Sequence, residues 1–310
     1  MKKNIFFIAL PLLLFLACQE SKKEATRQAE VEFEAISLLG DTLYASTPSD
    51  AVLAQLEEKK AAYKNDPNVE NLIWYGRYIA YSGAYQEAID FYTMGIEEFP
   101  EDARLYRHRG HRYISTRQFD KAIADFEKAA QLREGKENEI EPDGMPNARN
   151  IPVSTLNGNI FYHLGLAHYL KGDDEAALAA YEKSLAASRM DDNLVSNANW
   201  LYMINRRLGR EDAAMEVLDP IDQSLDIIEN TAYHNLCLFY KAVISEETLT
   251  AAASGALSSN DAINYGLGNW YLAEGDTTRA LEVFDEILSH EGWASFGYIA
   301  AEADKARLSR

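Results

Sequence analysis

Small residues recur in this chain at a fixed phase, and this periodicity restricts the fold more than any other feature. Four glycines are each followed by an alanine twelve residues later and by an aromatic residue sixteen residues later. The sets are Gly76, Ala88 and Tyr92; Gly110, Ala122 and Phe126; Gly165, Ala177 and Tyr181; and Gly268, Ala280 and Phe284. A repeat of a few tens of residues predicts a stack of similar structural units.

Each unit is predicted to be a pair of amphipathic helices. Gly83, Gly172 and Gly275 stand seven residues after three of the four origins, and glycine readily ends a helix with a positive φ. Glycine and alanine at the repeated positions allow the two helices to approach closely. Because one pair cannot bury its apolar face alone, neighbouring pairs must stack.

One of these units carries enough of a known pattern to be compared with a family. The residues Leu72, Tyr75, Gly76, Ile79, Ala88, Tyr92, Gly95 and Pro100 resemble a tetratricopeptide repeat. The resemblance covers residues 35–307 and implies an all-α fold, a right-handed superhelical α-solenoid of helix–turn–helix repeats. It also implies a protein that binds a protein or peptide, although repeats of this kind say little about which one.

The resemblance divides the chain as follows: an N-terminal cap at 35–66, clear repeats at 69–102, 103–134, 158–191 and 261–290, weaker repeats at 195–260, and a C-terminal capping helix at 294–307. In the N-terminal cap, a helix at 48–63 is expected to pair with a second helix at 35–43, which Gly40 interrupts. The C-terminal helix is expected to turn Glu302, Asp304, Lys305 and Arg307 toward solvent.

The N-terminus is interpreted as a targeting segment. Lys2 and Lys3 precede an apolar run at 5–17 that is too short to span a bilayer. Residues 14–18, Leu-Phe-Leu-Ala-Cys, resemble a bacterial lipobox, which implies that residues 1–17 are a signal peptide and that Cys18 is acylated. Residues 18–34 would then be a lipid-anchored tether. The alternative is an ordinary signal peptide with an incidental cysteine.

The lipobox also implies a place in the cell envelope. Residue 19 is glutamine and not the aspartate typical of inner-membrane retention, so we expect an outer-membrane lipoprotein that faces the periplasm or the surface. The run Lys22-Lys23-Glu24 resembles lipoprotein export signals of the Bacteroidetes.

An insertion at 135–157 interrupts the repeats. It is longer than the usual connection between repeats, and Pro142, Pro146 and Pro152 prevent a continuous helix. Connections of this length are commonly either functional or disordered, and the sequence leaves both open. The insertion is expected to lie outside the core of helix pairs.

The composition argues against a nucleic-acid partner, and the sequence offers no catalytic or cofactor-binding motif. The net charge is −19, from 49 acidic and 30 basic residues, whereas binding to nucleic acid requires a basic surface. No phosphate-binding loop, nucleophile elbow or zinc-protease motif is present, so we expect no catalysis and no cofactor. His108 and His111 share a helix, but a pair without a third ligand favours solvated or groove-lining histidines over a metal site.

Basic residues nevertheless concentrate where the repeat phase points inward. The first helix of each tetratricopeptide unit lines the concave groove of the solenoid. The resemblance therefore places seven candidate partner-binding residues on or near that face: Arg77, Arg104, Arg107, His111, Asn199, Arg206 and Arg207. Arg109 and Arg112 should lie off it. Several guanidinium groups on one wall suit an anionic partner group. The alternative is that these arginines pair with acids of neighbouring helices.

Three functions follow in order of support. The first is a non-catalytic scaffold or assembly factor in the cell envelope that holds a protein or peptide in its groove. The second is a glycan-binding lipoprotein similar to the SusD group, whose insertions carry exposed aromatic residues, whereas residues 135–157 have none. The third is an enzyme, for which no set of residues stands out.

Overall fold

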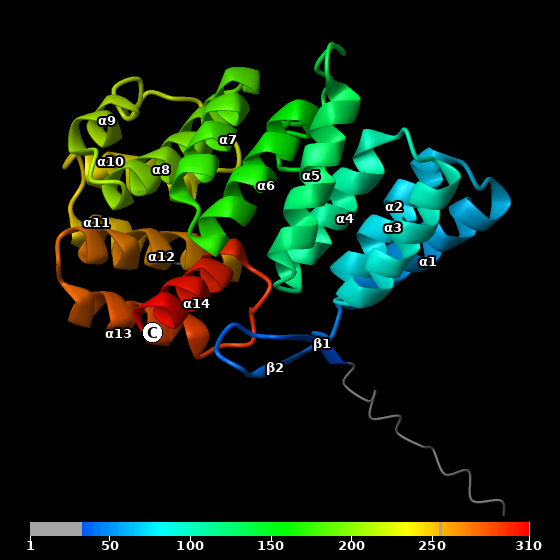
Figure 1. Cartoon of the computed structure of the whole chain (residues 1–310), viewed down its shortest axis with the longest axis horizontal. Coiled ribbons are helices and arrows are strands. Elements are labelled where there is room, and N and C mark those ends of the chain that lie inside the picture. The colour runs from blue at the N-terminus through cyan, green and yellow to red at the C-terminus, as the bar shows by residue number, and fades with distance from the viewer. Residues whose placement is uncertain (1–32, 254–255, 310) are drawn as a thin grey trace, which may run out of the picture. The chain divides into compact units, whose positions relative to one another are not determined.

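The computed structural model describes residues 33–253 and 256–309, and the expected signal peptide, Cys18 and most of the tether lie outside them. Fourteen helices follow a short β-hairpin across these residues (Figure 1). The hairpin consists of β1 (Phe33–Ile36) and β2 (Thr42–Tyr44). The helices are α1 (Asp50–Asn65), α2 (Val69–Tyr81), α3 (Tyr85–Glu98), α4 (Ala103–Ser115), α5 (Phe119–Arg133), α6 (Leu156–Lys171), α7 (Asp174–Ala187), α8 (Asp191–Arg207), α9 (Glu211–Glu216), α10 (Thr231–Tyr240), α11 (Glu246–Ala251), α12 (Leu257–Ala273), α13 (Thr277–Leu288) and α14 (Phe296–Leu308).

The repeated small residues are the contact points within the helix pairs, which confirms the predicted solenoid of helical repeats. A Cβ added to Gly76 would lie 2.6 Å from the ring of Tyr92, and one added to Gly165 would lie 2.6 Å from the ring of Tyr181. The same holds for Gly110 with Phe126 and for Gly268 with Phe284. These glycines are required because an aromatic ring rests directly on the helix backbone.

Overpacking one of these contacts should be costly. Ala122 in α5 has no exposed surface, so Ala122→Leu is expected to lower the free energy of unfolding by about 1–3 kcal/mol. The neighbouring Lys121 is exposed and donates a hydrogen bond to Gln118, so Lys121→Leu should change it by less than about 0.5 kcal/mol. Urea unfolding of both variants measures the difference. Equal losses would show that the helix faces are assigned wrongly.

The prediction of a helix at 35–43 is wrong, because these residues form the β-hairpin. Ala35 and Leu43 pair across the two strands and face the core, whereas Phe33 and Tyr44 pair on the outer face and are 55% and 48% exposed. Gly40 takes φ +96° in the turn, which fits a hairpin and interrupts a helix. A lone hairpin is marginal in water. This one is held by the domain, since the indole Nε1 of Trp293 donates to the carbonyl of Tyr44 over 2.8 Å.

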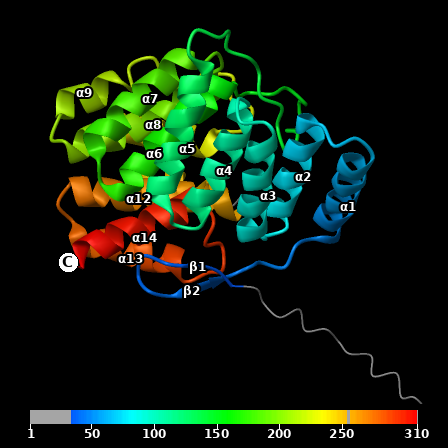
Figure 2. The same cartoon turned by 45° about the vertical axis from the view of Figure 1, so that its right-hand side comes forward.

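The C-terminal helices fold back onto the middle of the chain. Helix α14 packs against α12, α13 and α6, and α12 also contacts α8 (Figures 1 and 2). The solvent-facing positions predicted for Glu302 and Asp304 are therefore wrong, because their exposed fractions are 0% and 4%. Lys305 and Arg307 keep partial exposure, as expected. Parts of α6 and α8 are thus covered by α14 and α12.

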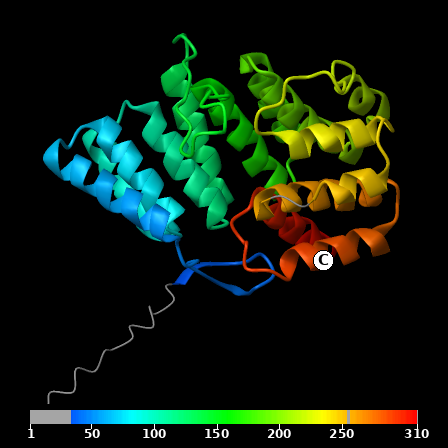
Figure 3. The same cartoon turned by 180° about the vertical axis from the view of Figure 1, so that it is seen from behind.

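The insertion between α5 and α6 is packed against the helices. Figure 3 shows this segment crossing the side of the helices that is turned away in Figure 1. Ile140 forms an isolated antiparallel bridge with Thr155, and Val153 is buried. Glu141 is also buried, with 7% of its surface exposed. The expectation that the insertion lies wholly outside the core is therefore wrong for Glu141 and Val153.

Candidate functional site

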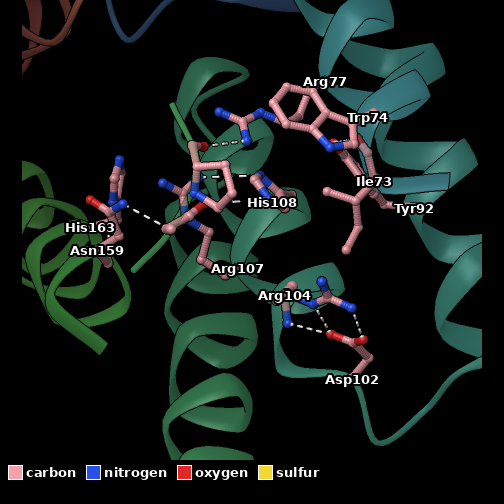
Figure 4. Close-up of polar contacts among 12 residues, drawn as sticks. Ile73, Trp74, Arg77, Tyr92, Asp102, Arg104, Arg107, His108, Asn159 and His163 are labelled. Atoms are coloured by element: carbon pink, nitrogen blue, oxygen red, sulfur yellow. Dashed lines mark hydrogen bonds and ion pairs between the residues drawn. The ribbon is translucent and has the colours of Figure 1, made fainter. Parts of the chain in front are cut away.

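Helix α4 supplies most of the cations of the candidate site. It starts at the N-cap Asp102, whose side chain accepts from the backbone N–H of Arg104. A turn of 3.6 residues puts Arg104, Arg107, His108 and His111 on neighbouring rows of the helix surface. Figure 4 shows Arg77 from α2, Arg107 from α4 and His163 from α6 facing the same space. Three consecutive first helices therefore build one wall.

The carboxylate of Glu141 occupies this wall. Its Oε2 lies 3.2 Å from Nε of Arg107, and its Oε1 lies 3.5 Å from Nε2 of His108. The side-chain amide of Asn159 in α6 donates to Oε2 over 2.8 Å. The next residue is held as well, because Arg77 Nη1 donates to the carbonyl of Pro142 over 2.9 Å. The insertion thus reaches into the groove with a carboxylate and a backbone carbonyl.

Positive charge at this wall exceeds the negative charge that compensates it. Burial lowers the pKa of Arg107, with the neighbouring Arg77 and Arg112 acting in the same direction and Glu141 opposing them. Arg112 is 9% exposed, and its guanidinium lies 5.7 Å from the centre of the Tyr85 ring. Within the part of the chain that the structure describes, Arg112 makes no ion pair. Glu141 pairs with Arg107 and lies near Arg77, and Asp143 also lies near Arg77, so no carboxylate among the described residues is left to pair with Arg112.

Three histidines near the arginines are held neutral. Burial lowers the pKa of His108 well below its usual value, and the charges of Arg107 and Arg77 lower it further. Burial also lowers the pKa values of His111 and His163. The rings of His111 and His163 lie 4.6 Å apart. Protonating any of them would add positive charge to a site that already has an excess of it.

Acidification is therefore expected to destabilise the fold. Histidines in the unfolded chain take up protons below a pKa of about 6.5, whereas the buried ones do not, so stability is present above that pH and is lost below it. Asp143 acts in the opposite sense, because burial and Glu229 raise its pKa to about 6. Asp143 is half-buried and the histidines are more numerous and deeper, so their effect should prevail. The urea midpoint should fall between pH 7.5 and pH 5.5, and a midpoint that rises would contradict this balance.

The structure brings together only part of the predicted site. Arg77 and Arg107 meet at the insertion, and His111 lies beside His163. Arg104 lies at the start of the same helix and pairs with Asp102 and Glu70, both at 2.7 Å. The cationic wall thus consists of fewer residues than the repeat phase indicated.

The other three predicted residues lie in contacts between helices. Arg206 pairs with Glu274 at 2.8 Å, and Arg207 lies 3.4 Å from Asp304. Asn199 is 1% exposed and accepts from the hydroxyl of Tyr240. Arg109, expected off the groove, donates to Asp125 between α4 and α5. These arginines therefore pair with acids of neighbouring helices, which was the alternative to a place in the binding groove.

Sequence reasoning missed four members of the site: Glu141, Asn159, His163 and Arg112. Arg112 was expected off the groove, yet its charge reaches His111 and Arg107. His163 stands two residues before Gly165, so the repeat phase could have placed it on the first helix of its unit. Glu141 carries no such signal, because the path of an insertion does not follow from the phase of the repeats.

A polar cavity of about 240 Å³ adjoins the site. The insertion, α6, α8 and α10 form its walls, and its lining includes Asn159, His163, Asn197, Glu229 and Tyr233. Among the described residues, no group of three or more histidine, cysteine, aspartate or glutamate side chains is placed to hold a metal ion. No helix within the described ranges is long and apolar enough to cross a membrane.

Comparison with known proteins identifies the repeats. The family model of the tetratricopeptide repeat matches residues 103–136 and 158–189, which include α4 with α5 and α6 with α7. A curated relative is the small glutamine-rich tetratricopeptide repeat-containing protein 2 of Saccharomyces cerevisiae, which is 31% identical over 101 residues. That match covers 33% of this chain and 23% of the yeast protein, so it spans about a quarter of the relative's length.

Solved structures with similar folds are also tetratricopeptide repeat proteins. YrrB, described as having an unusual peptide-binding site, is 16% identical with a TM-score of 0.43, over 81% of this chain and 99% of its own. A repeat protein from Parabacteroides merdae is 14% identical with a TM-score of 0.45, over 80% of this chain and 92% of its own. The matched segments establish that this helical solenoid contains tetratricopeptide repeats at residues 103–136 and 158–189.

Proposed function

We propose that this protein is a non-catalytic scaffold of the cell envelope, anchored through Cys18, that binds an anionic segment of a protein partner at the wall formed by Arg77, Arg107 and Arg112. Tetratricopeptide repeat proteins generally bind protein or peptide partners without catalysis, and the repeats of this chain support that class of function. We add to this class of function an anionic partner segment and a location in the cell envelope.

One observation carries the proposed chemistry: Arg77, Arg107 and Arg112 lie close together, and among the described residues only Arg107 of these three forms a side-chain ion pair, with Glu141. Buried charges are costly, and a cluster of them with pKa values shifted by burial and by one another is a candidate functional site. Guanidinium groups bind carboxylates and phosphates through paired hydrogen bonds. An acidic protein segment therefore fits the wall, and the net charge of −19 argues against nucleic acid.

Selection from a random peptide library tests this chemistry directly, because it requires no named partner. The full chain should enrich peptides rich in aspartate and glutamate, and Arg107→Gln should lose that enrichment. Arg279→Gln is the matched control, because Arg279 is an exposed arginine of α13 that pairs with Glu246. Enrichment should also decline as salt rises, since screening weakens exposed charge interactions. Peptides without an acidic preference would refute the proposal.

The anchor has its own test. If Cys18 is acylated in bacterial cells, the wild type should enter the detergent phase on phase separation, and Cys18→Ser should remain in the aqueous phase. Two acyl chains account for this shift, because each buried methylene contributes about 0.8 kcal/mol. Cys237→Ser is the control, because the thiol of Cys237 is buried in the core. Identical partitioning of wild type and Cys18→Ser would exclude the anchor.

The glycan-binding alternative gains no support from the geometry. The insertion contacts the helices through a carboxylate and backbone carbonyls, and residues 135–157 have no aromatic side chain to stack on a sugar.

A further inference from the structure

We propose that residues 140–145 of the insertion act as a built-in ligand of the cationic wall, and that the partner is an extended acidic segment with the same pattern, a glutamate followed by proline, which displaces them. The inference rests on the proposed function and names both the partner motif and its competitor.

The segment is held in the manner of a bound peptide. Glu141 is the side chain that enters the wall, and the carbonyls of Pro142 and Gly144 accept from Arg77 at 2.9 Å and from the hydroxyl of Tyr78 at 3.5 Å. Proline disfavours the helical conformation of the residue before it, so Glu141 is kept extended. One carboxylate and two backbone carbonyls are groups that a separate peptide with the same pattern also offers.

The backbone of the segment lies directly against side chains of α2. A Cβ added to Gly144 would overlap the hydroxyl of Tyr81 and would lie 2.5 Å from Nη2 of Arg77. A side chain at this position would therefore displace Tyr81 and Arg77 or the segment itself. The pattern Glu-Pro-Asp-Gly at 141–144 thus combines a charged anchor, a fixed extended turn and a close backbone approach.

The contacts that hold the segment are incomplete, so a competing peptide can replace it. Within the described residues, Nε of Arg107 and Oε1 of Glu141 are buried without a hydrogen-bond partner, although Nε lies 3.2 Å from Oε2 of Glu141 and Oε1 lies 3.5 Å from Nε2 of His108. Ile140 and Met145 are 60% and 64% exposed, so apolar burial adds little. Asp143 lies near the acidic Glu229, and the pKa of Asp143 is raised to about 6 by burial and that neighbour. At neutral pH this repulsion weakens the closed arrangement.

A segment tethered to the same chain competes strongly with a free peptide even when its own contacts are incomplete. Attachment through a short linker gives an effective concentration in the millimolar range. A free peptide must therefore overcome the insertion, and weakening the insertion should increase the affinity for the peptide. This competition distinguishes a built-in ligand from a structural loop. Weakening a structural loop would not increase the affinity for the peptide.

The test uses a fluorescent peptide with the sequence of residues 136–146 and the full chain. Glu141→Gln removes the charge of the internal segment, and Gly144→Ala forces the segment and the side chains of Arg77 and Tyr81 apart while keeping that charge. Both variants are expected to bind the peptide at least about tenfold more tightly than the wild type, which corresponds to about 1.4 kcal/mol. Glu139→Gln is the control, because Glu139 is exposed and pairs with Arg133, away from the wall. The same peptide with glutamine at the position of Glu141 should lose this gain.

Melting temperatures show whether each variant is folded, and either folded variant suffices for the test. If both folded variants bind the peptide no better than the wild type, or bind the glutamine peptide equally well, the built-in ligand is refuted. Library selection separates this failure from that of the proposed function. Acidic enrichment without binding of the 136–146 peptide would leave an acidic-segment site whose partner has another pattern, and loss of both would remove the site itself.

Discussion

Glu302→Ala is expected to lower the free energy of unfolding by about 3–5 kcal/mol, because it leaves a buried arginine without its counter-charge. Glu302 accepts from Arg117 Nη2 at 2.7 Å and from the backbone N–H of Leu38 at 2.6 Å, and it has no exposed surface. Its carboxylate therefore joins the turn after α4, the β-hairpin and α14. Urea unfolding measures the loss.

The matched control lies close by on the surface. Asp285 in α13 pairs with Lys305 of α14, and its side chain is 59% exposed. Exposed ion pairs contribute about 0–1 kcal/mol, so Asp285→Ala should cost no more than that. Glu302→Gln keeps the shape and part of the hydrogen bonding, so it should fall between the two. If Glu302→Ala and Asp285→Ala lower the free energy of unfolding equally, the buried ion pair between Glu302 and Arg117 contributes no more to stability than an exposed pair.

Arg117 also shows why a repeat can depart from its own pattern. It stands where three other units have glycine, and it adopts φ +61°, which is unfavourable for a residue with a side chain. Besides Glu302, its guanidinium donates to the carbonyls of Ser115 and Trp293. These contacts offset the backbone cost. The sequence alone marks Arg117 as an exception without showing its partner 185 residues away.

The packing within the repeats could be predicted because spacing along a helix determines it. Gly165 and Tyr181 meet because Gly165 lies on the face of α6 that is turned toward α7, and the ring of Tyr181 is large enough to reach it. The hairpin was missed because the helical phase was extended into residues 35–43. The buried Leu43 between the exposed Thr42 and Tyr44, and the turn at Gly40, are the signals of a strand pair in that short segment.

The candidate site depended on contacts that no local pattern contains. Arg107 was predicted to lie on the groove face, and in the structure it is buried beneath Glu141 of the insertion. Arg207 also faces inward, where Asp304 of α14 meets it. Repeat phase predicts which side of a helix faces the concave surface. It does not predict whether an insertion or a later helix of the same chain fills that surface.

Trp200→Ala is expected to cost about 3–5 kcal/mol, the loss that follows from removing a large buried aromatic side chain. Trp200 is 2% exposed and lies in α8, stacked on Tyr181 of α7 with ring centres 5.9 Å apart. Its indole N–H donates to the hydroxyl of Tyr162 in α6 over 2.7 Å, so the substitution also removes a buried donor. One side chain thus connects three successive helices.

Trp270→Ala provides the comparison, since Trp270 is half-buried and packs edge-on against Phe239 at 5.1 Å. Its loss should be nearer the average for single substitutions, about 1 kcal/mol. Trp200→Phe should recover part of the packing without the hydrogen bond and should fall between the two alanine variants. The three urea midpoints decide the matter. If Trp270→Ala unfolds as early as Trp200→Ala, the stability of the solenoid does not depend on the junction of α6, α7 and α8, and the aromatic stacking there is incidental.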